Sequence, residues 1–544
     1  MITNSIINLA KPDNEPVKNY QPGSPEKAEL KRHLDAMLAD EIEIPLWIGG
    51  KAVQTGKLAK CVCPHDHAHV LGHYHQAGAE QVHQAADAAA KAWPAWSSWP
   101  WERRAAVFLK AAELLSTKFR PILNGATMLG QSKTAFQAEI DSACELIDFF
   151  RFNSHFAARM MADQPDSAAG AWNTVDYRAL EGFIFAVTPF NFTSIAGNLP
   201  TAPALMGNTV LWKPASSAVY SAHFIMKLLE AAGLPPGVIN MIPGPGSQVG
   251  DPAMNHPSLA GIHFTGSTAV FQRMWKTVGE NIQRYKAYPR IVGETGGKDF
   301  IVAHASAEPE SLVANIVRGA YEFQGQKCSA ASRLYVPKSL WNRIEEPLVE
   351  AIRSIPMGAP TDFRNFVTAV IDEGAFNSIK GYIDFAKKSP DATVLAGGEC
   401  DRTRGYFIRP TLVRAAKPDF KLMQEEIFGP VLTAYVYPDR EFEKTLEVCD
   451  RTSPYALTGA IFARDREAVH LAMEKLRHAA GNFYINDKPT GAVVNQQPFG
   501  GGRASGTNDK AGSIFNLMRW VSIRTIKETF VPAADYRYPF MAGE

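Results

Sequence analysis

The pattern of apolar and polar positions divides the chain into a helical first part and a longer part in which strands and helices alternate. From Trp101, apolar side chains recur at the three- and four-residue intervals of one helix face, and Pro100 and Pro121 bracket this segment. A second helix is predicted over about 138–160. Residues 162–172 contain few large apolar side chains, so we expect a loop or the start of a hairpin there.

From residue 182, short apolar runs alternate with helical segments. Strands are predicted at 183–188, 209–212, 238–242 and 261–264. Helices are predicted between and after them, at 194–206, from a Ser216 or Ser217 cap to Gly233, and from about Ser267. Strands separated by helices imply right-handed crossovers and a parallel sheet, whose ligand edge lies at the carboxyl ends of the strands. The segments at those ends are 189–191, 213–214, 243–246 and 265–267.

A second α/β unit is predicted after Gly293. Its first elements are a strand at 300–303, a helix at 309–321 and a strand at 333–336. The tail at 520–530 alternates weakly, which is typical of an edge strand that needs a partner. The chain of 544 residues has room for three or four domains of roughly 150 residues each.

Composition and charge exclude several classes of protein. Hydrophobic residues make up 46% and charged residues 20%, which is ordinary for a globular chain and excludes a disordered protein, a coiled coil or a fibre. The 56 basic and 55 acidic residues leave a net charge of +1, so nucleic acid is not expected as a partner. The uncharged stretch 182–212 is long enough to cross a membrane, but its prolines and asparagines would leave polar groups stranded in lipid, so we expect buried interior and no membrane.

Cysteine usage favours a reducing compartment. Apart from Cys61 and Cys63, the six cysteines are scattered, which argues against a disulfide framework in a chain of this size. Residues 1–25 have neither an apolar signal core nor an Arg-rich amphipathic pattern, so no targeting segment is expected. The expected location is bacterial cytoplasm, with a mitochondrial matrix after removal of a presequence as the alternative.

The run from Cys61 through Cys63, His65 and His67 to His69 is a candidate metal site. A continuous strand would place these five side chains on one face. Their spacing lacks the separated ligand pairs of common zinc sites, and the run leads into Val70–Gly72, which suits the edge of a hairpin. We therefore predict no metal site, although the sequence does not settle the point.

Two glycine-containing strand ends suggest phosphate binding without proving it. Gly244 to Gly250 is near the dinucleotide fingerprint, but its last spacing is one residue too long, and an ordinary Gly-Pro turn explains it better. Thr265–Ser267 offers hydroxyls and backbone amides at a helix start, which fits either a phosphate site or a simple helix cap.

Cys328 and Glu294 are the candidate nucleophile and base. Cys328 follows a flexible turn, where Lys327 or a helix N-terminus could activate the thiol, although a buried structural cysteine is the commoner case. Glu294 precedes Gly296 and Gly297, which allow close backbone approach or positive φ. Its carboxylate is either a general base or a solvated loop acid.

Taken together and in order, these motifs resemble the aldehyde dehydrogenase superfamily over roughly residues 45–530. The motifs are 189–192, 213–214, 264–267, 294–298, 325–329 and 425–430. Finer features resemble those members that oxidise L-glutamate γ-semialdehyde, the open form of 1-pyrroline-5-carboxylate, to L-glutamate in the second step of proline catabolism. These features are 139–145, 149–153, 481–486, 491–492, 496–500 and 504–509.

The resemblance implies an α/β fold with a Rossmann-like NAD-binding domain (1–161 with an N-terminal extension, and 182–293) and an α/β catalytic domain (294–515). It also implies a β-flap oligomerisation element (162–181 and 516–544). Lone flap strands need partners, so a homodimer or higher homo-oligomer is expected. A transient contact with a proline dehydrogenase is a further possibility that the resemblance raises.

The resemblance also assigns roles to residues. Cys328 becomes the nucleophile, Asn191 an oxyanion donor and Glu294 the base for water. The cofactor is NAD, with Lys213 on the adenine-side ribose, Ser267 on the pyrophosphate, Glu426 on the nicotinamide-side ribose and Phe428 packing against it. The other expected cofactor-site residues are Pro189, Phe190, Ser216, Gly246, Gly250, Thr265 and Gly266. Many relatives that favour NAD carry an acid at the place of Ser216, so the preference over NADP stays open.

For the substrate, the resemblance assigns the α-carboxylate to Ser329, Gly491 and Ala492, and its aliphatic part to Phe192 and Phe499. Glu145 and Lys327 help to shape the pocket, unless either of them belongs to a structural ion pair. Two alternatives remain. One is another semialdehyde dehydrogenase, acting for example on succinate semialdehyde, which needs no amine site. The other is a non-catalytic aldehyde dehydrogenase scaffold, which the intact Cys328 and Glu294 disfavour.

Overall fold

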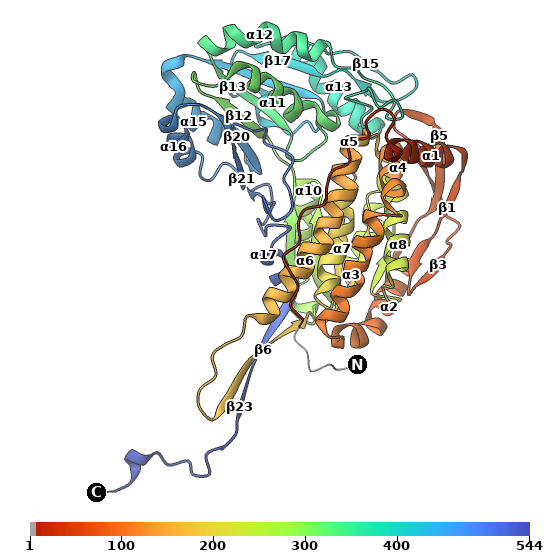
Figure 1. Cartoon of the computed structure of the whole chain (residues 1–544), viewed down its shortest axis with the longest axis vertical. Coiled ribbons are helices and arrows are strands. Elements are labelled where there is room, and N and C mark those ends of the chain that lie inside the picture. The colour runs from red at the N-terminus through yellow and green to blue at the C-terminus, as the bar shows by residue number, and fades with distance from the viewer. Residues whose placement is uncertain (1–6, 544) are drawn as a thin grey trace.

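The computed structural model describes residues 7–543. Residues 1–6 of the predicted NAD-binding domain and residue 544 of the predicted flap lie outside this range. Two seven-stranded sheets with packed helices form two adjoining lobes, and a two-stranded ribbon projects away from them (Figure 1). Within residues 7–543, no helix is long and apolar enough to cross a membrane.

The first sheet is the predicted parallel sheet with two antiparallel strands added at one edge. Its strand order is β11 (Arg290–Glu294), β10 (Leu259–Thr265), β7 (Phe183–Val187), β8 (Thr209–Lys213), β9 (Ile239–Met241), β2 (Leu46–Ile48) and β3 (Lys51–Val53). The first five strands run parallel, and β2 and β3 run antiparallel to their neighbours. All four strands predicted between 183 and 264 are confirmed.

The crossover helices are α7 (Thr193–Leu205), α8 (Val219–Ala232), α9 (Gly246–Met254) and α10 (Thr268–Glu280). Helix α8 ends at Gly233 as predicted, in a left-handed C-cap with φ 90°. The predicted serine cap of this helix is wrong. Residues Ser216–Ala218 form a 3-10 turn first, so that Ala218 occupies the N-cap position.

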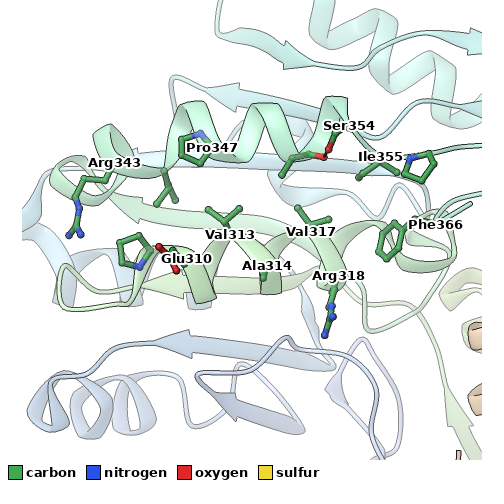
Figure 2. Close-up of a pocket in the computed structure, with 14 residues that line it drawn as sticks. Glu310, Val313, Ala314, Val317, Arg318, Arg343, Pro347, Ser354, Ile355 and Phe366 are labelled. Atoms are coloured by element: carbon green, nitrogen blue, oxygen red, sulfur yellow. Dashed lines mark hydrogen bonds between the residues drawn. The ribbon is translucent and has the colours of Figure 1, made fainter. Parts of the chain in front are cut away.

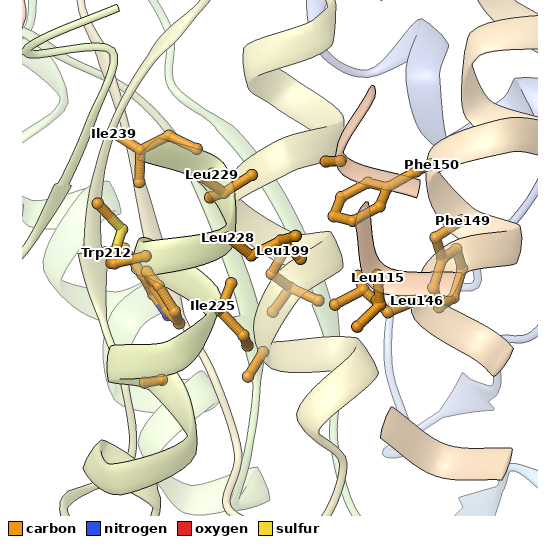
Figure 3. Close-up of a cluster of buried hydrophobic side chains, with 14 of the residues drawn as sticks. Leu115, Leu146, Phe149, Phe150, Leu199, Trp212, Ile225, Leu228, Leu229 and Ile239 are labelled. Carbon is orange, nitrogen blue, oxygen red and sulfur yellow. The ribbon is translucent and has the colours of Figure 1, made fainter. Parts of the chain in front are cut away.

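Helices from the N-terminal part cover this sheet. They are α2 (Ala79–Ser98), α3 (Trp101–Ser116), α4 (Arg120–Gln131), α5 (Ala135–Ala138), a π-helix (Glu139–Cys144) and α6 (Glu145–Ala162). The predicted helices at 101 and 138–160 are confirmed, but Pro121 lies in the first turn of α4, where its missing N–H leaves no bond unmade. In Figure 3, buried side chains join helices to sheet, among them Leu115, Phe150, Leu199, Ile225 and Trp212.

The second sheet carries the catalytic-domain residues of the prediction. Its order is β14 (Ala392–Ala396), β17 (Thr411–Ala415), β18 (Val431–Tyr437), β13 (Ala331–Pro337), β12 (Asp299–Ala303), β20 (Thr458–Phe462) and β21 (Asn482–Ile485). Only β14 runs antiparallel to its neighbour. Its larger helices are α11 (Pro309–Tyr321), α12 (Lys338–Arg353), α13 (Glu373–Lys388), α15 (Phe442–Arg451) and α16 (Arg466–Lys475). The three elements predicted between 300 and 336 are confirmed.

The projecting ribbon pairs two segments that are far apart in the sequence. Strand β6 (Ala171–Ala179) runs antiparallel to β23 (Val521–Thr529) over their full lengths. Residues 163–170 form neither helix nor strand, so the loop alternative predicted for 162–172 is confirmed, whereas the hairpin alternative is wrong because β6 pairs with the remote β23. The predicted tail strand is confirmed. Most side chains of β23 are exposed, and the ribbon stands clear of both lobes (Figure 1).

The Cys61–His69 run does not form one strand face. Strand β4 (Leu58–Cys63) ends at a turn, and β5 (Asp66–His75) returns alongside it with register shifts beside Cys61 and Cys63. The predicted hairpin is confirmed, but the expected alignment of five side chains is wrong because the turn falls inside the run. Among the described residues, no group of three or more histidine, cysteine or acidic side chains is placed to hold a metal ion.

Candidate active site

Cys328 lies where two cavities meet. One cavity of about 470 Å³ is bounded by the carboxyl ends of β7, β8 and β10. The other, of about 670 Å³, is bounded by the π-helix, α6 and the loop around residues 488–499. Cys328 lines both cavities and is itself only 8% exposed. A single thiol is thus presented to two separate binding spaces.

The turn before Cys328 has an uncommon backbone that neighbouring segments hold in place. Phe323, Gln324 and Gly325 all have positive φ, from 51° to 64°, which costs energy for the two residues that are not glycine. The buried amide of Gln324 compensates by donating to Ala369 O at 2.8 Å and accepting from Thr368 N at 2.9 Å. The position of the nucleophile is therefore fixed by bonds to another loop.

Neither predicted activator acts on the thiol. No helix begins at Cys328, because β13 follows it. The Lys327 ammonium lies 3.4 Å from Glu322 Oε2 and 3.9 Å from Asp141 Oδ2. Burial raises the pKa of Cys328 well above its usual value, and the nearby carboxylates of Asp299, Glu426 and Glu294 raise it further. The expectation that Lys327 or a helix N-terminus activates Cys328 is wrong.

Glu294 is the last residue of β11, and its carboxylate is held by the loop that closes over it. Gly501 N donates to Glu294 Oε2 at 2.9 Å. Partial removal from water raises the pKa of Glu294 well above its usual value, although the Gly501 N–H and the Lys510 ammonium oppose this shift. A carboxylate with a raised pKa accepts a proton more readily, which suits a general base.

These two shifts predict how the rate depends on pH. Both the thiol and the carboxylic acid must lose a proton to act, and the pKa of each is raised. At saturating cofactor, kcat/KM for the aldehyde should therefore rise steadily from about pH 6 to about pH 9. A stopped-time assay across this range checks the slope, and a rate that falls over the same interval would contradict the assignment of both groups.

Gly296 and Gly297 allow the two active-site segments to come together. A Cβ on Gly296 would lie 2.1 Å from Glu426 Oε2, and one on Gly297 would lie 2.3 Å from Cys328 O. Gly297 N donates to Glu426 Oε1 at 2.9 Å. Neither glycine has positive φ, so of the two predicted reasons for glycine here, close approach is the correct one.

The smaller cavity has the chemistry of a dinucleotide site. The Lys213 side chain is 9% exposed, and its ammonium contacts only the carbonyl of Pro214 at 3.4 Å among the described residues. Burial lowers the pKa of Lys213 to about 8. Ser267 occupies the N-cap of α10, yet its hydroxyl makes no capping bond. A buried cation without an anionic partner and an uncapped helix start both fit ribose and phosphate oxygens.

Most of the predicted cofactor residues line this cavity. They are Pro189, Phe190, Lys213, Gly246, Gly250, Thr265, Gly266, Ser267, Glu426 and Phe428. Phe190 and Phe428 meet edge to face at 5.8 Å. Ser216 does not line the cavity; it is exposed and begins the 3-10 turn that follows the buried end of β8.

All seven predicted substrate residues line the larger cavity. They are Glu145, Phe192, Lys327, Ser329, Gly491, Ala492 and Phe499. The buried hydroxyl of Ser329 lies 2.8 Å from Thr490 Oγ1, which connects the turn of the nucleophile to the loop of Gly491 and Ala492. Asn191, which is 3% exposed, donates one amide hydrogen to Gln326 O at 3.0 Å, and its second amide hydrogen is not used by that bond.

A buried lysine that the sequence did not indicate lies behind two residues of the cavity wall, Asp141 and Phe192. Lys133 is fully buried, with its ammonium 2.7 Å from Asp141 Oδ2 and 4.4 Å from the ring centre of Phe192. Lys327 contacts the same Asp141 and Glu322, so two ammonium groups face two carboxylates. The only available signal was that Asp141 precedes Glu145 by one helical turn in the motif 139–145.

Lys327 belongs to an ion pair, as one of the two predicted roles required, but among the described residues Glu145 belongs to none. It accepts a hydrogen bond from Ser194 Oγ at 2.6 Å instead. Burial raises the pKa of Glu145 to about 8, with the charge of Asp141 adding to the shift. At neutral pH this side chain therefore holds its proton for much of the time and can donate a hydrogen bond into the cavity.

A third hollow, of about 760 Å³, lies between α11 and α12 and is drawn in Figure 2. Its lining is mainly aliphatic and aromatic and includes Val313, Val317, Ile355 and Phe366. It contains none of the predicted site residues. The candidate active site is therefore the pair of cavities that share Cys328.

Comparison with known proteins agrees with this geometry. Residues 51–526 match the aldehyde dehydrogenase family, and the chain belongs to this family. It is 53% identical to the mitochondrial delta-1-pyrroline-5-carboxylate dehydrogenase of Dictyostelium discoideum, over 98% of this chain and 96% of that protein. The family resemblance drawn from the motifs is confirmed.

Two solved structures extend the comparison. The delta-pyrroline-5-carboxylate dehydrogenase of Mycobacterium tuberculosis bound with NAD is 52% identical, with a TM-score of 0.96 over 99% of this chain and 100% of that chain. Proline utilization A (PutA) from Bdellovibrio bacteriovorus is 30% identical, with a TM-score of 0.90 over 96% of this chain but only 54% of that chain. The predicted aldehyde dehydrogenase fold is therefore confirmed.

Proposed function

We propose that this protein oxidises L-glutamate γ-semialdehyde, the open form of 1-pyrroline-5-carboxylate, to L-glutamate with NAD as hydride acceptor. The observation that carries the proposal is the position of Cys328 between a dinucleotide-type cavity and a cavity with charged and hydroxyl groups suited to an amino acid. The names of the similar proteins support the same substrate.

The reaction begins with attack of the Cys328 thiolate on the aldehyde carbon, which places a negative charge on the aldehyde oxygen. The unused amide hydrogen of Asn191 and the Cys328 backbone N–H hold this oxyanion. Fixed donors of this kind stabilise the transition state by about 3–4 kcal/mol each. NAD in the smaller cavity would supply the acceptor for the hydride that leaves this carbon, and the carbon would stay bound to Cys328 as a thioester.

Water then releases the product. Glu294 takes a proton from a water molecule, which attacks the thioester carbon and frees L-glutamate and the Cys328 thiolate. On the cofactor side, Lys213 would hold the adenine-side ribose, Ser267 the pyrophosphate and Glu426 the nicotinamide-side ribose, and Phe428 would pack beside it. The burial of Lys213 and the uncapped hydroxyl of Ser267 support these roles.

Recognition of the substrate rests on the larger cavity. Ser329 and the backbone amides of Gly491 and Ala492 hold the α-carboxylate, and Phe192 and Phe499 enclose the aliphatic part. The charged wall of Asp141, Glu322 and Lys327 disfavours aldehydes that are apolar throughout, because such substrates offer these groups no polar partner.

A substrate panel tests the proposed function. NAD reduction at 340 nm is measured with L-glutamate γ-semialdehyde, succinate semialdehyde and propanal. The kcat/KM for the first should exceed the others by about 100-fold or more, since missing polar groups leave site groups unpaired. Equal rates with succinate semialdehyde would support another semialdehyde dehydrogenase, and no reduction with any aldehyde would support a non-catalytic scaffold.

Ser216 gives a prediction for cofactor choice. Because the position lacks an acid, nothing there repels the 2′-phosphate of NADP. The substitution Ser216→Glu should lower kcat/KM for NADP by about tenfold or more while changing that for NAD less than about twofold. Steady-state kinetics with both cofactors checks this, and an equal loss for NAD and NADP would contradict it. Ser217→Glu, one residue further along, is the matched control.

We further propose that the ribbon of β6 and β23 pairs with a second copy, giving a homodimer or a higher homo-oligomer. The exposed outer edges of this ribbon support the proposal, because unpaired strand edges are normally covered. Sedimentation analysis should find no monomer at micromolar concentration.

We also propose a transient contact with a proline dehydrogenase and a location in bacterial cytoplasm or a mitochondrial matrix.

A further inference from the structure

The segment from Leu9 to Tyr20, called here the N-terminal strap, forms part of the substrate cavity. It has no regular secondary structure and runs along α6 toward α1 (Pro25–Ala39), as Figure 1 shows. Asn14, Glu15 and Val17 of the strap line the larger cavity together with the loop that carries Gly491 and Ala492. The sequence motifs gave no reason to place these residues at the site.

Asn14 connects two walls of this cavity through its side-chain amide. Its Nδ2 donates to Asp148 Oδ2 on α6 at 2.8 Å and to Val494 O at 3.0 Å. Its Oδ1 accepts a hydrogen bond from Gln496 Nε2 at 2.9 Å. Both amide hydrogens and the carbonyl oxygen are thus used, two of the three bonds going to the loop 490–497.

The strap itself is held firmly, so it can serve as a fixed support. Asp148 also accepts from Glu15 N at 2.8 Å, and Glu139, which is fully buried in the π-helix, accepts from Lys18 N at 2.8 Å. The guanidinium of Arg120 donates to the carboxylate of Glu15 at 2.5 Å. Hydrogen bonds to charged groups are among the stronger ones, so the strap is bonded to the same helices that form the charged cavity wall.

The loop that Asn14 holds makes few hydrogen bonds to the rest of the protein, although the side chain of Val494 packs into the hydrophobic core of the first lobe. Residues 490–497 contain no helix or strand, and Gly491 is exposed with φ 90°. On one side the loop is joined to the nucleophile turn by the bond between Thr490 and Ser329. On the other side, its bonds to the rest of the protein run through Val494 and Gln496 to Asn14.

We propose that Asn14 is a positioning residue that sets the place of the carboxylate-binding loop against α6, and so contributes to selectivity for α-amino-acid semialdehydes. The inference rests on the proposed function, since it concerns binding of the α-carboxylate. A simple aldehyde does not use this loop. Loss of Asn14 should therefore weaken the amino-acid substrate selectively and leave the chemistry at Cys328 intact.

The experiment compares Asn14→Ala and Gln496→Ala with the wild type. For each, KM for L-glutamate γ-semialdehyde should rise by about 5- to 20-fold, with kcat within about twofold, because a binding interaction and not a reaction step is lost. The kcat/KM for propanal should change less than about twofold. The Kd of the product L-glutamate, from isothermal titration calorimetry, should rise by a similar factor.

Controls separate positioning from folding. Lys11→Ala, at an exposed position of the same strap, should behave as the wild type. Gln496 is exposed and makes no other bond to the strap. Gln496→Ala therefore removes one bond between the loop and Asn14, and it serves as the test even if Asn14→Ala folds poorly. An unchanged KM and Kd in the Gln496 variant, or equal losses with propanal, would overturn the inference. If the wild type itself does not oxidise the semialdehyde, the proposed function falls and this inference with it.

Discussion

Replacement of Cys328 by alanine should lower kcat by about 10⁴-fold or more, because no other group can form the covalent bond to the aldehyde carbon. Cys328 is the only cysteine that lines both cavities, as far as the described residues show. The remaining carboxylates and hydroxyls at the site are poor nucleophiles toward an aldehyde at neutral pH. NADH formation under saturating aldehyde and NAD measures the loss.

Two control measurements show whether the loss of activity is specific to the Cys328 thiol. Binding of NAD, measured by calorimetry, should survive in Cys328→Ala, since Lys213 and Ser267 on the same cavity are not changed and only the thiol is removed. Cys400→Ser, which alters a half-buried thiol far along the chain, should keep the wild-type rate. Retention of more than about a tenth of the wild-type kcat in Cys328→Ala would exclude a thioester route.

Replacement of Glu294 by glutamine should stop the reaction after the thioester has formed. Glutamine keeps a carbonyl oxygen for the hydrogen bond from Gly501 N, so the loop should stay in place, but it cannot take a proton from water. We expect kcat to fall by about 10²- to 10⁴-fold, the usual contribution of a general base. After mixing with aldehyde and NAD, mass spectrometry should find an acyl adduct on the peptide that contains Cys328.

A nucleophile that needs no base provides the control. Hydroxylamine attacks thioesters directly, so it should release the adduct from Glu294→Gln and restore much of the turnover, while changing the wild-type rate little. An adduct that fails to accumulate, together with an unchanged steady-state rate, would remove the role assigned to Glu294. Loss of activity without rescue would instead indicate that the variant disturbs an earlier step.

The strand and helix pattern was predictable because local signals and packing agree. The strands at 183–188 and 209–212 are short apolar runs bounded by turn residues, and they lie in the centre of the first sheet. The motif residues Cys328, Ser267 and Glu426 were also found correctly at the cavities, because their spacing in the chain resembles that of a family. Each of these motifs taken alone also fits an ordinary structural role, such as a helix cap or a buried cysteine.

Predictions from the sequence failed mainly where a residue's contacts come from a distant part of the chain. Lys327 follows Glu322 by five residues, but its ammonium also meets Asp141 from a different helix, and no local pattern reveals that pairing. Asn14 reaches the loop of Val494 across most of the length of the chain. Ser216 is not the helix cap, because the chain makes a 3-10 turn before α8.

The most direct test of the account is a crystal structure of the protein with NAD and L-glutamate bound together. The account predicts the nicotinamide ring and the γ-carboxyl group on opposite sides of Cys328 Sγ, with the α-carboxylate at Ser329, Gly491 and Ala492. Glutamate bound elsewhere, or NAD and glutamate in sites that do not both reach Cys328, would contradict it.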